Sequence, residues 1–192
     1  MKPIAAGETW AHFLTEGAAR DAILVLDGWL VAPLGPSGHA LASAYFSDLL
    51  ETTGMKPLAP LSVSQAADLS LPGFSAIQEL TTSHASFHYF APTEGKPRPR
   101  IHLDLFSCRA FDVESAVEIA ARHFGLGDWS GTFVLRSVDS AERQTWELAG
   151  EGSFIHERCQ LVRSQGQGRL FVGPRGPVIG EGTGDPLRFG DT

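Results

Sequence analysis

The chain has 192 residues, of which 43% are hydrophobic and 19% are charged, with a formal net charge of −7. This length and composition are typical of one globular domain with an appended segment. The acidic balance argues against a nucleic-acid or anionic-membrane partner, because both require clustered Lys and Arg. An apolar stretch at 22–31 is interrupted by Asp27 and Gly28 and is too short to cross a bilayer. Cys108 and Cys159 form neither a disulfide framework nor a zinc-binding spacing, so we expect a cytoplasmic protein.

The first part of the chain alternates apolar runs with turn residues. A strand, a helix and three further strands are expected there in order, at residues 22–31, 38–53, 56–65, 74–80 and 84–90. Ser37 is the expected helix cap and Gly54 the expected stop. Thr81, Thr82 and Ser83 are expected to link the last two strands of this series.

The second part continues with a half-buried strand at 101–107, a helix at 113–124 capped by Asp112, and a strand at 129–137. Residues 142–148 and 154–162 are expected to form a late hairpin. After Ser164 the chain is rich in glycine and proline, and we expect it to be largely loop or partly disordered.

Runs of strands with short links, separated by two helices, predict an α+β fold. We expect a two-layer sandwich, with a mainly antiparallel sheet and helices on one face. The expected organisation is a domain at 1–137 followed by a Gly/Pro-rich C-terminal extension at 138–192.

Four side chains with catalytic chemistry surround the expected 81–83 link. Ser75 precedes Ser83 by eight residues, His88 follows it by five, and Cys108 ends the next expected strand. Enzymes that decarboxylate amino acids need an electron sink for the carbanion that remains. The chain has three lysines, Lys2, Lys56 and Lys96, and none occupies a position suited to holding pyridoxal phosphate.

These four residues, with the strand and helix order around them, resemble the pyruvoyl-dependent S-adenosylmethionine decarboxylases of the short prokaryotic type, over roughly residues 20–137. The resemblance implies a proenzyme that cuts itself between Thr82 and Ser83, leaving a pyruvoyl group made from Ser83 that forms a Schiff base with the substrate amine. It implies that Ser75 stabilises the processing site, that His88 is the processing base, and that Cys108 returns a proton to the substrate. It also implies a homodimer that acts in polyamine (spermidine) biosynthesis on a small amino-acid-type substrate.

The sequence departs from the family pattern at substrate-recognition positions. Thr82 replaces the glutamate that precedes the cleavage site, and Leu69 stands where an adenine-stacking aromatic is expected. The same chemistry on arginine or ornithine is therefore an alternative to S-adenosylmethionine.

Two further alternatives remain open. One is a His/Asp metal site built from His84, His88, His102 and Asp104 on neighbouring strands. The other is an unprocessed, non-catalytic homologue that acts as a binding or regulatory protein, an interpretation favoured by the Thr82 replacement. Cys159 is expected to be a structural thiol.

Overall fold

The computed structural model describes residues 20–35, 38–68, 70–109, 111–137, 143–163, 169–173 and 176–178. Two helices, α2 (Gly38–Thr53) and α3 (Val113–Phe124), lie within this part of the chain. Its strands are β1 (Arg20–Leu30), β2 (Ser62–Gln65), β3 (Gly73–Leu80), β4 (Ser83–Phe90), β5 (Arg100–Ser107), β6 (Leu126–Ser137), β7 (Arg143–Glu151), β8 (Phe154–Arg163), β9 (Arg169–Gly173) and β10 (Gly176–Val178). The expected cap Ser37, the replaced position Leu69 and most of the tail beyond Ser164 lie outside the described residues.

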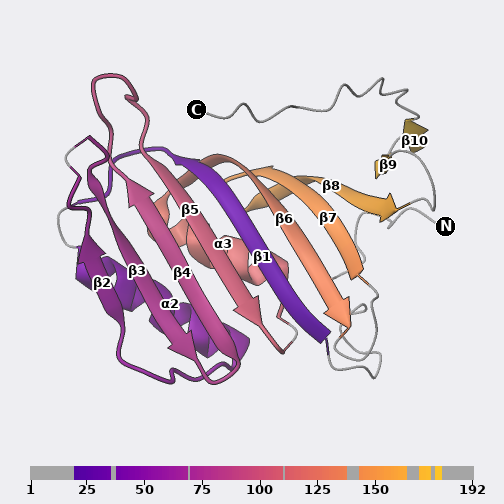
Figure 1. Cartoon of the computed structure of the whole chain (residues 1–192). Helices are drawn as coiled ribbons and strands as arrows, with labels where there is room; N and C mark the ends of the chain where they lie inside the picture. Colours follow the sequence, from indigo (N-terminus) through magenta and orange to yellow (C-terminus); the bar gives the residue numbers. More distant parts are fainter. Residues whose placement is uncertain are drawn as a thin grey trace, which may run out of the picture.

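The strands form one sheet in the order β10-β9-β8-β7-β6-β1-β5-β4-β3-β2 (Figure 1). Every neighbouring pair is antiparallel. The first strand is central, because β1 pairs with β5 on one side and with β6 on the other. Residues far apart in the sequence therefore meet across β1.

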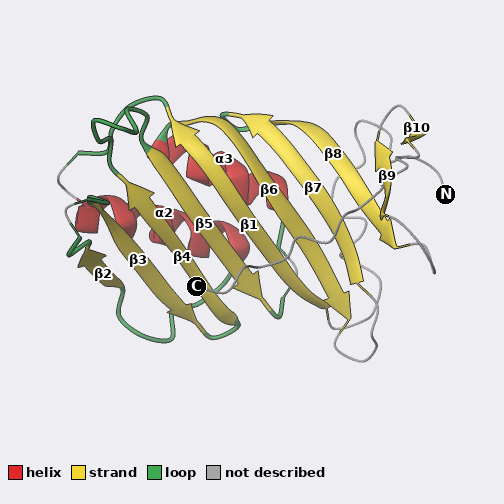
Figure 2. Cartoon of the chain, turned by 45° about the horizontal axis from the view of Figure 1, so that its top comes forward, coloured by secondary structure: helices red, strands yellow, loops and turns green. Residues whose placement is uncertain are grey.

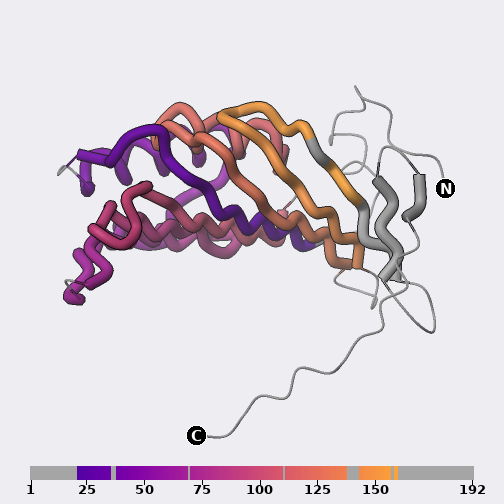
Figure 3. Tube along the Cα trace, turned by 90° about the horizontal axis from the view of Figure 1, so that it is seen from above, coloured from indigo at the N-terminus to yellow at the C-terminus, as the bar shows by residue number. Residues whose placement is uncertain are grey.

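Helices α2 and α3 lie together against one face of this sheet, and the opposite face bears no helix within the described residues (Figures 2 and 3). The alternation of side chains explains the two layers. In β5, Ile101, Leu103 and Leu105 are buried, whereas His102 and Asp104 between them are partly exposed. The expected two-layer α+β sandwich with helices on one face is confirmed.

Local signals account for the bounds of α3, which match the expected helix. Asp112 caps its N-terminus by accepting a hydrogen bond from the Ser115 backbone N–H at 2.9 Å. Gly125 ends it in the left-handed conformation, with φ 65°, and its N–H donates to the Ala121 carbonyl. Helix α2 ends likewise before Gly54, with φ 64°.

An aromatic cluster joins the helices to the sheet. Phe87 of β4 is fully buried, and its ring lies 4.8 Å from that of Phe124 in α3 and 5.8 Å from that of Tyr45 in α2, centroid to centroid. Burial raises the pKa of the Tyr45 phenol far above its ordinary value. Because interior packing is dense, this cluster holds β4 rigidly against the helical layer.

Two expectations need correction. The second strand was expected over 56–65 but covers only Ser62–Gln65; nearer its expected start, Pro57 forms an isolated bridge with Leu80, and Pro60, which has no N–H to donate, lies between the two. Beyond Ser164, where loop was expected, β9 and β10 extend the sheet. The predicted late hairpin is confirmed as β7 and β8, and its pairing with β6 carries the sheet through the expected boundary at 137/138.

Candidate active site

The backbone is strained at the start of β4. Ser83 has φ 149°, and it is the only non-glycine among the described residues with a positive φ. A side chain in such a conformation costs roughly 1–3 kcal/mol and persists where the surrounding structure enforces it. Here two strands enforce it, because Ser83 pairs with Leu80 in β3 and with Ser107 in β5.

The carbonyl group just before Ser83 is held by a backbone donor. The Cys108 N–H donates to the Thr82 carbonyl oxygen at 3.0 Å. The Thr82 hydroxyl is buried and has no hydrogen-bond partner in the described part of the chain, which costs further free energy at the same peptide. The Thr82–Ser83 bond therefore combines a strained residue, a polarised carbonyl and an unsatisfied hydroxyl.

The unusual φ places the Ser83 hydroxyl beside the next side chain. Successive side chains of a regular strand point to opposite faces, yet Ser83 Oγ lies 3.4 Å from His84 Nδ1. The imidazole of His84 is exposed and packs edge-on against Phe106, with centroids 5.8 Å apart. A potential proton acceptor thus stands within reach of the hydroxyl, at a residue to which the sequence analysis assigned no catalytic role.

Ser75 and His88 form a second group farther along the sheet. They are directly opposite in the β3–β4 ladder, and Ser75 Oγ lies 2.7 Å from His88 Nδ1. Gly73 enables this pairing, because a Cβ at that residue would lie 1.9 Å from the Tyr89 carbonyl oxygen. Glycine is therefore required two residues before Ser75 for steric reasons, because only a residue without a Cβ lets β3 approach β4 at this register.

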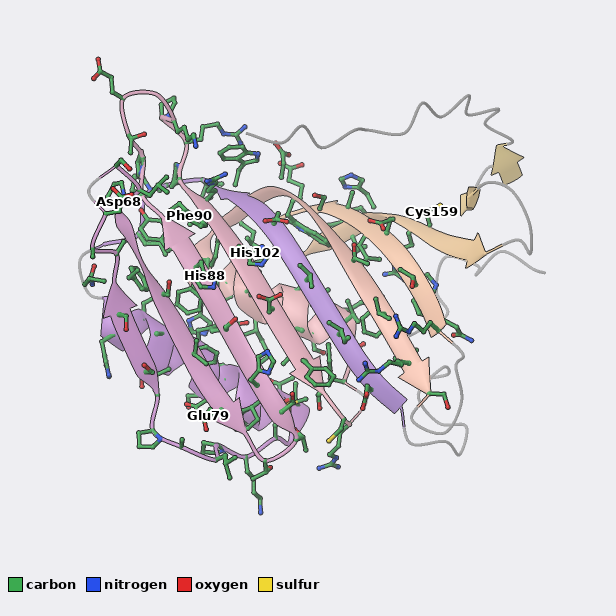
Figure 4. The ribbon with its side chains drawn as sticks, viewed as in Figure 1. Asp68, Glu79, His88, Phe90, His102 and Cys159 are labelled. Atoms are coloured by element: carbon green, nitrogen blue, oxygen red, sulfur yellow. The ribbon has the colours of Figure 1, made fainter. Side chains whose placement is uncertain are left out.

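The structure brings the four expected site residues together as two pairs, not as one site. Ser83 and Cys108 meet at the β3–β4 turn, and Ser75 and His88 meet toward the opposite end of β4. At roughly 3.3 Å per residue, the five residues from Ser83 to His88 span about 16 Å. Figure 4 shows the separation: His88 stands well up the sheet from Glu79, which lies beside the β3–β4 turn. One chain alone cannot assemble the expected site.

Next to His88 lies a histidine held by two carboxylates (Figure 4). His102 Nδ1 lies 2.9 Å from Asp27 Oδ1, and His102 Nε2 lies 3.3 Å from Asp104 Oδ2. The rings of His88 and His102 are 6.1 Å apart. Because both nitrogens of His102 already face carboxylates, neither is available to a metal ion, and no group of three or more metal-ligating side chains occurs in the described residues. The alternative metal site is therefore not supported.

Three features of this site escaped the sequence analysis. The role of the Cys108 N–H has no sequence signal, because every residue except proline has this backbone group. The φ of Ser83 could not be predicted either, because it depends on pairing with two other strands. His84 had a sequence signal, its position directly after Ser83, but no pattern indicated that neighbours on a strand would meet. Of the two cysteines, Cys108 is exposed and Cys159 is buried.

Comparison with known proteins identifies the family. No curated protein matches the chain. Within the described residues, no helix has the length and apolarity needed to traverse a bilayer. The sequence profile described as S-adenosylmethionine decarboxylase matches residues 28–137, which is more than half of the chain. The match runs from the last residues of β1 to the end of β6 and includes both pairs of site residues. The chain therefore belongs to the S-adenosylmethionine decarboxylase family.

Proposed function

We propose that this protein is a self-processing decarboxylase that cuts its own backbone between Thr82 and Ser83 and uses the resulting pyruvoyl group at residue 83. The observation that carries this proposal is the hydrogen bond from the Cys108 N–H to the Thr82 carbonyl, next to a strained Ser83. A backbone donor on that oxygen stabilises the negative charge that develops when the carbonyl carbon is attacked. Family membership makes a decarboxylase the expected product of such processing.

The first step is an acyl shift at Ser83. Its hydroxyl loses a proton to His84 Nδ1 while Oγ attacks the Thr82 carbonyl carbon, and the oxygen of that carbonyl becomes an oxyanion facing the Cys108 N–H. The Ser83 nitrogen then takes a proton and its bond to the carbonyl carbon breaks, leaving an ester. Relief of the φ strain favours this step, because breaking the Thr82–Ser83 peptide bond removes the backbone dihedral that the pairing with β3 and β5 holds at an unfavourable value.

The second step removes the Ser83 α-proton, and the ester C–O bond breaks so that Thr82 leaves as a carboxylate. The residue at 83 becomes an enamine, and hydrolysis of its imine form releases ammonia and leaves the pyruvoyl ketone. His88, oriented by Ser75, is the base. Because this pair lies about 16 Å from Ser83 of its own chain at strand spacing, we assign the role to His88 of a second copy. The protein is thus a homodimer with two composite sites.

The open sheet face is the surface on which two copies meet. It carries partly or fully exposed apolar side chains on several strands, including Ile23 and Val25 of β1, Ile77 of β3 and Val134 of β6. Both pairs of site residues border this face. In the proposed dimer, two such faces pack together with Ser83 and Cys108 of one copy opposite Ser75 and His88 of the other.

Once formed, the ketone at residue 83 supplies an electron sink for the carbanion that decarboxylation leaves. Cys108, exposed beside residue 83, holds the proton that its thiol returns to the substrate carbon. The substrate is a small molecule of the amino-acid type, S-adenosylmethionine or a basic amino acid, and the product enters polyamine synthesis.

Intact-mass spectrometry of freshly purified protein tests the processing step. We expect two chains, residues 1–82 and a pyruvoyl-blocked 83–192. A folded protein that remains a single chain of 20.6 kDa overturns the enzyme proposal and favours the non-catalytic homologue.

Co-expression of two inactive variants tests the composite site. Ser83→Ala and His88→Ala are each expected to remain uncut when made alone. In a mixed dimer, the Ser83 of the His88→Ala copy meets the intact His88 of the Ser83→Ala copy, so cleavage returns in one of the two sites. If both single variants stay uncut and the mixture stays uncut although mixed dimers form, the two-copy site is wrong.

A further inference from the structure

A pocket of about 440 Å³ opens on the helix-free face, at the end of the sheet away from the Thr82–Ser83 bond. It lies where β1 and β6 lose register: Gly28 pairs with Trp129, but the next pair is Leu30 with Leu126. An irregularity of this kind re-aims the side chain beside it. Trp29 is accordingly 37% exposed and forms one wall of the pocket.

Two carboxylates and the tryptophan give the pocket its chemistry. Asp27 and Asp128 both line it, and their side chains are 71% and 74% exposed. Arg100 also borders the pocket, but its guanidinium stacks 4.5 Å from the Phe90 ring centroid. Negative charge beside an exposed aromatic face is the environment that binds organic cations.

The chain itself places a cation there. Arg98 lies in the connection between β4 and β5, and its guanidinium carbon stands 5.0 Å from the Trp29 ring centroid. Its Nη2 lies 3.7 Å from Asp128 Oδ2. Because both partners of this ion pair are more than half exposed, the contact is weak and can be exchanged for another. Arg98 therefore shows which functional group suits this position: a planar guanidinium on an indole, next to a carboxylate.

We propose that this pocket binds the guanidinium group of a small-molecule amino acid, which takes the place of Arg98. The pocket adjoins the Ser75–His88 pair, since Asp27 both lines it and contacts His102, whose ring lies 6.1 Å from that of His88. That the bound molecule is the substrate rests on the proposed decarboxylase. In that case the substrate is of the arginine class, with its guanidinium in the pocket and its reacting end toward His88.

Binding is measured by calorimetry on the Ser83→Ala protein, in which no turnover can occur. The ligands are arginine, citrulline, which has a neutral urea of nearly the same shape, and ornithine, which has an ammonium. We expect arginine to bind at least about tenfold more tightly than citrulline, which corresponds to about 1.4 kcal/mol. Ornithine is expected to bind more weakly than arginine, because an ammonium cannot stack flat on the indole.

Arginine affinity is also measured for variants in the Ser83→Ala background, to distinguish binding in this pocket from a general effect of charge. Asp128→Asn is expected to weaken arginine binding about tenfold. Arg98→Ala is expected to strengthen it severalfold, because the competing internal guanidinium is gone. Arg143→Ala is the matched control: it removes the same charge at the opposite end of the sheet and is expected to leave affinity unchanged.

Equal affinity for arginine and citrulline, or for arginine and ornithine, overturns the guanidinium assignment. If Arg98→Ala does not bind arginine more tightly than Arg143→Ala does, the proposal that the ligand takes the place of Arg98 is wrong. If Asp128→Asn binds arginine as tightly as the parent protein, the ligand does not bind in this pocket. The outcome is distinct from that of the processing test. Arginine binding in a protein that never cleaves rejects the decarboxylase and keeps the pocket, whereas cleavage without arginine binding rejects the pocket assignment alone.

Discussion

The two faces of strand β4 differ in what they contribute. Ala85 and Phe87 lie on the helix-covered face and are almost completely buried, with Phe87 at the centre of the aromatic cluster. His84 and His88 lie on the open face, within reach of Ser83 and Ser75 respectively. Neighbouring residues of one strand thus belong to different physical environments, a dry apolar layer and a polar surface.

The side chains that stabilise the fold and the side chains proposed to act in catalysis therefore alternate along the same strand. Burial of apolar surface on the covered face supplies the free energy that holds the strands in register. That register enforces the strain at Ser83 and the approach of Ser75 to His88. Substitutions on one face should therefore change one property and largely spare the other.

Ser83→Ala should have the largest effect on the chemistry. Without a hydroxyl no acyl shift occurs, so cleavage and decarboxylation are both lost completely, and the thermal midpoint changes by only a few degrees. Mass spectrometry and a thermal melt on the same sample test both statements. A cleaved Ser83→Ala protein would place the nucleophile elsewhere.

Cys108→Ala should separate processing from turnover. The backbone N–H that donates to Thr82 is retained, so cleavage should proceed, whereas loss of the thiol should reduce decarboxylation by about 10²–10⁴-fold. Fragment mass and kcat are the two measurements. Loss of cleavage with an intact fold would instead assign the thiol to the processing step.

Phe87→Ala should destabilise the fold by roughly 3–5 kcal/mol, because it leaves a cavity among packed rings. His88→Ala, one residue later, should change the free energy of unfolding by less than about 1 kcal/mol while blocking cleavage. Denaturant unfolding of the two variants, each in the Ser83→Ala background, gives the comparison. Equal destabilisation by the two would contradict the division between the faces.

Ser83→Gly should be more stable than Ser83→Ala by about 1 kcal/mol, because glycine adopts φ 149° without steric cost. Both variants lack the hydroxyl, so they differ in backbone strain and in the larger conformational entropy that glycine loses on folding, which opposes the expected gain. Denaturant midpoints at matched m-values decide the question. A glycine variant that is the less stable of the two would mean that the strain at residue 83 is smaller than the entropy cost of glycine, contrary to the value expected here.

The smallest effect concerns the link between the two helices on the covered side. The hydrogen bond from His123 and the nearby Arg122 lower the pKa of the Asp48 carboxyl below its ordinary value of 3.8. A lowered pKa in the folded state contributes stability above the ordinary value, and the contribution is lost as the pH falls through the lowered one. Asp48→Asn should therefore reduce the thermal midpoint slightly at neutral pH and should no longer differ from the parent below the lowered pKa. If the thermal midpoints of Asp48→Asn and the parent still differ at a pH below the lowered pKa, this ion pair is not the source of the difference.

Local sequence signals determined a large part of this protein. The Asp112 cap, the Gly125 stop and the apolar spacing between them were sufficient for α3, because each acts within a few residues. Period-two alternation placed β5 and its buried face. The spacing of Ser75, Ser83, His88 and Cys108 was sufficient to indicate the family, since family motifs are themselves patterns in sequence.

Long-range pairing decided the rest. Only the assembled sheet places the Cys108 N–H on the Thr82 carbonyl, turns Ser83 toward His84, and separates Ser83 from His88 by most of a strand. Strand β1 must lie between β5 and β6 before Asp27 can meet His102 or the pocket beside Trp29 can form. These features depend on which strands are neighbours and in which register, and neighbour choice is a property of the whole folded chain that no short stretch of sequence carries.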